Sequence, residues 1–145
     1  MSQDIVCPNC GEGHMNYKKQ DVQISRKGIR GVVPDISGLF CSKCEEIDFD
    51  NTTDSAERYA AEGDRLLLLA REKAIQTGRL LKAARIKLDL TQNQASLLSG
   101  GGHNAFSRYE TGTVQPIAAV VNLFQILEKH PELLKELDEK NSLSE

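Results

Sequence analysis

Residues 90–112 of the chain, LTQNQASLLSGGGHNAFSRYETG, decide the fold of its C-terminal half. Thr91 is followed three residues later by Gln94, a spacing typical of a capping box at the start of a helix. This capping box predicts a helix over residues 92–98. The run of small residues at 99–102 then predicts a turn, because consecutive glycines do not continue a helix.

Helical signals continue on both sides of this turn. A third helix is predicted over residues 104–110, Pro116 precedes a fourth, and Pro131 begins a fifth. A first helix starts at Gly78 and carries four apolar residues on one face, namely Leu80, Leu81, Ala84 and Leu88. Helices in this order form the layout of a helix-turn-helix domain, in which the third helix enters the major groove of DNA. We therefore predict such a domain over residues 78–145.

Two polar residues of the third helix are suited to contact DNA bases. Asn104 and Arg108 are four residues apart and therefore share a helix face. Asparagine can form two hydrogen bonds with adenine, and arginine can form two with guanine. Because helix N-termini favour anions, a second set of residues is expected to lie near the DNA backbone or to support the base contacts. These supporting residues are Thr91, Gln92, Ser107 and His103.

Each main candidate also has an alternative role that the sequence leaves open. Asn104 could cap its own helix, and Arg108 could bond Glu110 or a phosphate instead of guanine. Gln92 could be a solvated surface residue.

The overall net charge of −3 argues against a nucleic-acid partner, but residues 78–130 contain six Lys and Arg against three acids. The basic excess therefore lies where a DNA-facing surface is needed.

All four cysteines lie in the first third of the chain, in two CxxC pairs. Two such pairs separated by a few tens of residues can close a tetrahedral site of four thiolates around one zinc ion. The predicted zinc ligands are Cys7, Cys10, Cys41 and Cys44, with His14 and His103 outside the ligand set. Gly11 permits the tight turn after the first pair. Residues 1–50 are too few to bury a large core, so we expect this head to fold around one structural zinc ion.

The segment between the two pairs contains short runs rich in β-branched residues. Met15–Tyr17, Val22–Ser25 and Ile29–Val33 are separated by glycine breaks, and Pro34 and Gly38 are expected to close the last segment. This pattern predicts a small antiparallel β-ribbon between the two cysteine pairs. Rubredoxin-like iron and a redox-active dithiol remain as alternatives to structural zinc. A rigid head without an open coordination position is best explained as a protein-binding module.

Residues 51–77 are predicted to form a connecting helix. Asp54 and Glu57 match a capping pattern, and small or apolar residues then repeat at three- and four-residue steps: Ala56, Ala60, Gly63, Leu67, Ala70 and Ala74. A helix that packs on its own head or on the next domain is compatible with this seam, and so is a dimeric coiled coil. Thr77-Gly78 is the expected hinge, although the same spacing continues to Leu88 and is also compatible with one long helix.

The composition indicates a cytoplasmic protein that does not cross a membrane. The longest apolar run, residues 66–70, is far too short to span a bilayer, and no signal-peptide pattern opens the chain. In the cytoplasm thiols stay reduced, so paired cysteines there more often hold a metal than form disulfides. No set of residues combines a nucleophile, a base and an oxyanion site, so an enzyme is not expected.

Three strings of the sequence are similar to a known family. They are Leu90–Ser96, Gly100–Gly112 (GGGHNAFSRYETG) and His130–Leu134, and together with the paired N-terminal cysteines they resemble the MqsA family of type II antitoxins. The resemblance implies a zinc-bound head that captures a toxin, typically an mRNA-cleaving RNase. It also implies a C-terminal domain that dimerises and represses its own operon, with Asn104 and Arg108 contacting bases of the operator.

The sequence thus predicts a mainly α-helical protein with a small β-containing zinc domain. We expect an antitoxin and autorepressor whose homodimer binds a palindromic operator, because a palindrome requires a two-fold symmetric protein. The acidic residues 132–139 are a candidate part of the dimer contact. The main alternative is a zinc-containing repressor without a toxin partner. A zinc-ribbon subunit of an RNA-handling enzyme is a weaker alternative.

Overall fold

The computed structural model describes residues 4–142 of the chain, with side chains up to residue 138. It divides the chain into two compact units, residues 1–70 and 71–145. The long helix α1 (Ser55–Lys87) contributes its first half to the first unit and its second half to the second. None of the described helices has both the length and the apolar character needed to cross a lipid bilayer.

The first unit contains a three-stranded antiparallel sheet in the order β1-β2-β3. Its strands are β1 (Met15–Arg26), β2 (Ile29–Cys41) and β3 (Ile47–Phe49). The β1–β2 turn places Lys27 and Gly28 at φ angles of 48° and 80°, so both central residues adopt the left-handed conformation that suits a two-residue hairpin. The predicted β-ribbon is confirmed, but β3 was not foreseen.

Pro34 and Gly38 lie inside β2, so the expectation that they close the ribbon was wrong. The register of β1 and β2 shifts between Gln20 and Val22, which leaves Pro34 and Asp35 of β2 without ladder partners on β1. The strand β3 pairs only with residues 38–40 of β2. Pro34 therefore lies at a bulge where its missing N–H removes no ladder hydrogen bond.

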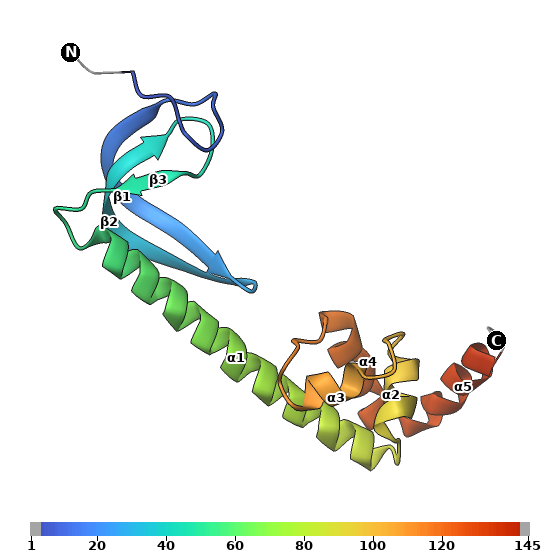
Figure 1. Cartoon of the computed structure of the whole chain (residues 1–145). Coiled ribbons are helices and arrows are strands. Elements are labelled where there is room, and N and C mark those ends of the chain that lie inside the picture. The colour runs from blue at the N-terminus through green and yellow to red at the C-terminus, as the bar shows by residue number, and fades with distance from the viewer. Residues whose placement is uncertain (1–3, 143–145) are drawn as a thin grey trace. The chain divides into compact units, whose positions relative to one another are not determined.

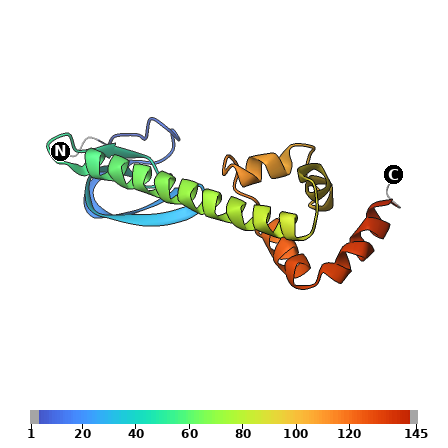
Figure 2. The same cartoon turned by 90° about the horizontal axis from the view of Figure 1, so that it is seen from below.

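The first half of α1 lies along one face of this sheet in both views of the molecule (Figures 1 and 2). Leu66 is fully buried and packs with sheet residues in a single core cluster, made of Ile24, Val33, Ile36, Phe40 and Leu66. Side chains of α1 come close to Gly31, where a Cβ would lie 2.4 Å from Glu62 Oε1 and 3.3 Å from Leu66 Cδ1. Leu67 is exposed, as are Ala56 and Ala60, so these members of the predicted seam were placed on the wrong face.

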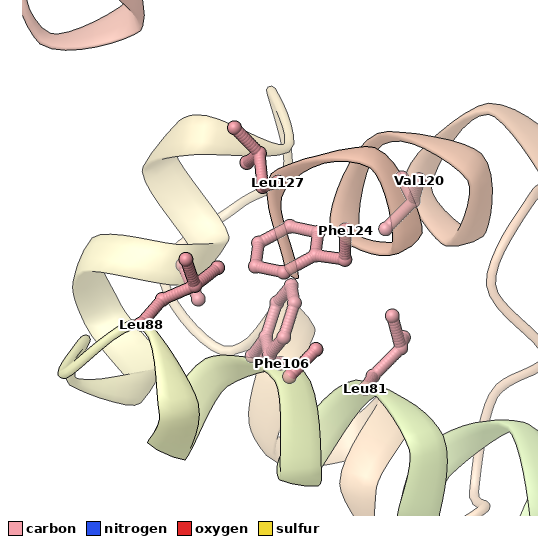
Figure 3. Packing of buried hydrophobic residues seen from close by; sticks show 8 residues of the cluster. Leu81, Leu88, Phe106, Val120, Phe124 and Leu127 are labelled. Carbon is pink, nitrogen blue, oxygen red and sulfur yellow. The ribbon is translucent and has the colours of Figure 1, made fainter. Parts of the chain in front are cut away.

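The second unit consists of helices packed around a small aromatic core. After α1 come α2 (Gln92–Leu98), α3 (Ala105–Glu110), α4 (Ala118–Lys129), a 3₁₀ turn η1 (Pro131–Leu133) and α5 (Leu134–Ser142). Phe106 of α3 meets Phe124 of α4 with ring centroids 4.7 Å apart. Leu81 of α1, Leu88 directly after α1, and Val120 and Leu127 of α4 surround this pair (Figure 3). Both phenylalanines are fully buried, so they anchor α3 to the rest of the unit.

Helices α1, α2 and α3 end in the same way. In each, a residue with positive φ follows the helix, and the next N–H bonds a carbonyl five residues earlier. The positive-φ residues are Asp89, Gly100 and Gly112, with φ of 56°, 71° and 75°. This arrangement is the Schellman motif, which satisfies the last carbonyls of a helix and turns the chain sharply. These turns fold the end of α1 and the helices α2, α3 and α4 around one small core.

The helix α1 continues without a break across Thr77-Gly78, where a hinge was expected. Gly78 is buried, and a Cβ on it would lie 2.1 Å from the carbonyl oxygen of Tyr109. The glycine therefore serves a close contact between α1 and the end of α3. Leu80 is 59% exposed, so its predicted place on the buried face with Leu81 was wrong.

Candidate metal centre and nucleic-acid interface

The four cysteines of the first unit come together in one cluster. Cys7 and Cys10 precede β1, Cys41 is the last residue of β2, and Cys44 lies in the turn before β3. Their sulfur atoms all lie within 4.8 Å of one another. The Sγ atoms of Cys7 and Cys44 are 3.7 Å apart, and those of Cys10 and Cys41 are 3.8 Å apart. A tetrahedral zinc site with ordinary Zn–S bonds has sulfur atoms about 3.8 Å apart, so the cluster fits a metal ion.

Backbone N–H groups point at the sulfur atoms from both turns. Gly13 N–H donates to Cys10 Sγ at 3.3 Å, and the N–H groups of Lys43 and Cys44 donate to Cys41 Sγ at 3.3 and 3.4 Å. These donors stabilise thiolates, which are the form that binds metal. The two turns are therefore shaped to hold ionised sulfur.

Backbone N–H groups and neighbouring thiols shift the pKa values of three of these thiols in different directions. The backbone N–H groups of Cys44 and Lys43 lower the pKa of Cys41 to about 6. The N–H groups of Glu12 and Gly13 lower the pKa of Cys10. The Glu46 N–H also lowers the pKa of Cys44, but burial and the neighbouring thiols Cys41 and Cys7 outweigh it and raise that pKa to about 11. A bound cation would compensate this mutual repulsion.

The surroundings of the cluster bear on the redox alternative. All four cysteines are free thiols, and the short sulfur–sulfur distances join one pair to the other pair. Each CxxC turn leads into a strand and not into a helix, whereas redox-active CxxC motifs start helices. His14, which was not expected to bind metal, has its Nδ1 2.9 Å from Asp4.

Gly13 is a residue of this site that sequence reasoning missed. A Cβ on Gly13 would lie 2.3 Å from Cys41 Sγ, so any larger residue would displace a ligand. The sequence pointed instead to Gly11, whose φ of 68° confirms the expected tight turn. No local pattern marks Gly13, because the atom that crowds it comes from the other cysteine pair.

In the second unit, α3 has one buried and one exposed face. Phe106 is in the core and Tyr109 is partly buried, whereas Asn104, Ser107 and Arg108 are exposed. The side chain of Asn104 makes no capping hydrogen bond, although the residue stands at the N-cap position. Arg108 forms no ion pair or side-chain hydrogen bond with residues 4–138. The exposed face of α3 thus offers an amide and a guanidinium that none of the described side chains of the unit engages.

The remaining predicted DNA-side residues take part in internal hydrogen bonds. Thr91 Oγ1 accepts from Gln94 N–H, and Gln94 Oε1 accepts from Thr91 N–H, which confirms the capping box. Gln92 Nε2 donates to Glu110 Oε2 at 2.9 Å. His103 Nδ1 lies 3.0 Å from Asn93 Oδ1. The role of all these residues in binding DNA stays a prediction.

Glu110 is not bonded to Arg108, which was one alternative left open by the sequence. Its carboxylate accepts instead from both Arg85 and Gln92. Ser96, also missed from the sequence, is fully buried, accepts from Phe106 N–H at 3.0 Å and donates to the Gln92 carbonyl at 2.8 Å. These contacts fix α3 against α2 and α1.

Two comparisons with known proteins bear on this chain. Residues 5–138 match the family model described as the antitoxin component of bacterial toxin–antitoxin systems, MqsA. The protein Antitoxin MqsA of Escherichia coli (strain K12) is 37% identical over 133 residues, which cover 92% of this chain and 99% of that protein. The match therefore includes both the cysteine cluster and the exposed face of α3.

Proposed function

The chain belongs to the MqsA family of bacterial antitoxins, and from this membership we propose that it neutralises a toxin protein and represses its own operon as a homodimer. The single observation that carries the DNA-binding half is the α3 face that exposes Asn104, Ser107 and Arg108. The toxin-binding half rests on family membership. Both activities act by binding, so the proposal includes no enzymatic step.

The head, residues 1–50, is the proposed toxin-binding part, and one zinc ion is its proposed cofactor. Zinc commonly fills closed sites of four thiolates, where it has no open position for a substrate. Bound there, zinc would cross-link the turn that precedes β1 to the turn that follows β2. The ligands Cys7, Cys10, Cys41 and Cys44 would thus give toxin a rigid surface. Residues 51–77 are proposed to connect this head to the DNA-binding part.

Residues 78–145 are proposed to be a helix-turn-helix domain with α3 as the recognition helix. Asn104 and Arg108 would contact base edges, with Thr91, Gln92, Ser107 and His103 at the backbone or supporting them. Charge supports this assignment. The ion pairs Arg85–Glu110 and Lys87–Glu128 each join one positive and one negative side chain. They therefore leave the excess of three positive charges in residues 78–130 unchanged. Such an excess favours approach to phosphate.

A homodimer would place two α3 helices in successive major grooves of a palindromic operator. Half-sites about one helical turn apart require a two-fold axis in the protein. Since both the operator and an intracellular toxin are reached in the cytoplasm, we propose that location for the protein.

Replacing Arg108 by alanine is expected to weaken operator binding by about 1–3 kcal/mol, because a bidentate contact to guanine is lost. Preference at one base pair of each half-site should relax. Arg108→Lys keeps the charge without the bidentate geometry, so it should lose the same preference while keeping the salt dependence of binding. Fluorescence anisotropy with operator and random duplexes at several KCl concentrations measures both quantities.

Arg79→Ala is the matched control, since it removes the same charge from the exposed surface of α1. It should leave base preference unchanged. Equal losses for Arg108→Ala on operator and random DNA, with a salt slope lower by about 1, would show that Arg108 contacts phosphate instead.

A further inference from the structure

The last residue of α3 is held by two other helices. The Glu110 carboxylate accepts from the Arg85 guanidinium, with Nη2 3.2 Å from Oε2, and from Gln92 Nε2 at 2.9 Å. The Arg85 and Glu110 side chains are only 14% and 5% exposed. Arg85 also donates from Nη1 to the Leu90 carbonyl at 2.9 Å. The network therefore joins the end of α1, the segment before α2, the first residue of α2 and the end of α3.

The orientation of α3 depends on contacts of this kind. A helix of six residues is too short to be stable alone, so its direction is set by what it packs against. Its first turn is held by the buried ring of Phe106 and by the bond from Phe106 N–H to Ser96 Oγ. Its last turn is held by Glu110. Because Arg108 is only two residues from Glu110, a rotation at this end would move the guanidinium directly.

The contacts of Arg85 and Gln92 with Glu110 differ in how much they contribute to stability. The Arg85 contact is nearly buried and charged, and removing one partner would leave an unpaired charge, so it matters for stability. The Gln92 contact is exposed and involves a neutral donor, so it adds little stability. It does, however, fix the distance between the start of α2 and the end of α3.

We propose that Gln92 is a positioning residue, which sets the orientation of α3 through Glu110 and does not bind phosphate with its side chain. This inference rests on the proposed binding of DNA by α3. It revises the expectation from sequence, in which the Gln92 amide lies at the phosphate backbone. The amide is directed instead at a carboxylate, whose negative charge opposes the approach of a phosphate to the same group.

The test uses the full-length, metal-loaded protein and a duplex of its own promoter region, measured by fluorescence anisotropy. Gln92→Ala should bind this duplex roughly tenfold more weakly, a loss of the size of one hydrogen bond. Its thermal midpoint, its binding to random DNA and its salt slope should stay unchanged. Gln125→Ala, which removes an exposed glutamine of α4, is the matched control and should bind as the unaltered chain does.

A double-mutant cycle distinguishes indirect from direct action. In the Arg85→Met, Glu110→Met background the buried pair is replaced by apolar side chains, which often preserves stability. Gln92→Ala should cost nothing further there, because its acceptor is gone. If that background does not fold, Glu110→Gln replaces it and should reduce the effect of Gln92→Ala.

An equal loss from Gln92→Ala in both backgrounds, or an equal loss on the promoter duplex and on random DNA, would overturn the inference and make Gln92 a phosphate contact. Equal binding by Gln92→Ala and the unaltered chain would overturn it as well, while leaving the proposed function intact. Failure of the unaltered chain to bind its promoter would instead overturn the proposed function itself.

Discussion

Replacing Cys41 by serine is expected to abolish metal binding and to unfold the first unit while the second unit stays folded. Cys41 ends β2, and its sulfur receives two backbone N–H groups of the second turn. A serine hydroxyl is a poor zinc ligand and does not replace the thiolate. Among residues 4–70, five buried side chains form the apolar cluster of this unit, so its stability depends on the metal.

Amide hydrogen exchange and metal analysis of the same samples measure this effect. The unaltered chain should contain one zinc ion per chain and should protect the amides of β1 and β2. Cys41→Ser should lose both, while α2, α3 and α4 keep their protection, because their core contains no residue of the first unit. Ser42→Ala changes the neighbouring residue, whose hydroxyl accepts from His14 N–H, and should retain the metal. Unchanged protection of β1 and β2 without metal would contradict a structural ion.

The same variant separates the two proposed activities. If residues 1–50 bind toxin and 78–145 bind DNA, Cys41→Ser should lose toxin neutralisation and keep operator binding. Loss of operator binding with intact protection of the second unit would mean that the head takes part in binding DNA.

Gly78→Ala is expected to destabilise the second unit by about 2–3 kcal/mol, although alanine is the better helix former. The added Cβ would lie 2.1 Å from the carbonyl oxygen of Tyr109 and 3.2 Å from the Cα of Glu110. Both are backbone atoms, so α1 or the end of α3 must shift to admit the methyl group. Because Arg108 lies beside these residues, operator binding should fall together with stability.

Gly63→Ala is the matched control in the same helix. There the nearest atom is Arg26 Nη2 at 3.4 Å, at the far end of a flexible side chain. Helix propensity then decides whether the substitution stabilises or destabilises the protein. We expect the free energy of unfolding of the first unit to rise by about 0.5–1 kcal/mol. Hydrogen exchange reports each unit separately. A stabilising effect of Gly78→Ala would show that α1 does not approach α3 as described.

Local features were predictable because their cause lies in neighbouring residues. The capping box of Thr91 and Gln94, the turn at residues 99–102 and the β-ribbon follow from short patterns that act within a few residues. The cysteine cluster was predictable for a different reason. Four thiols in two pairs have few arrangements other than a shared metal.

What the sequence did not reveal depends on atoms that are distant in the chain. The strand β3 has three residues and exists because Gly38–Phe40 offers it an edge. Gly13 and Gly78 are required by Cys41 and Tyr109, which lie 28 and 31 residues further along. The placement of Leu66 inside and Leu67 outside depends on where the sheet meets α1, and a three- or four-residue period does not decide between neighbours.

The sequence predicted which residues lie on the candidate DNA surface, but not the contacts that hold α3 in place. Asn104, Ser107 and Arg108 share an exposed face, as helical spacing implies. The bond from Gln92 to Glu110 joins two helices through side chains eighteen residues apart, and no spacing rule indicates it.

The most direct test of the account is a growth experiment with this chain and the product of its neighbouring gene. The neighbour, expressed alone, should arrest growth. Co-expression of this chain should restore growth, and a tag on either protein should purify both as one complex. A neighbour without toxicity and without a complex, together with intact operator binding, would contradict the antitoxin role and leave a repressor without a toxin.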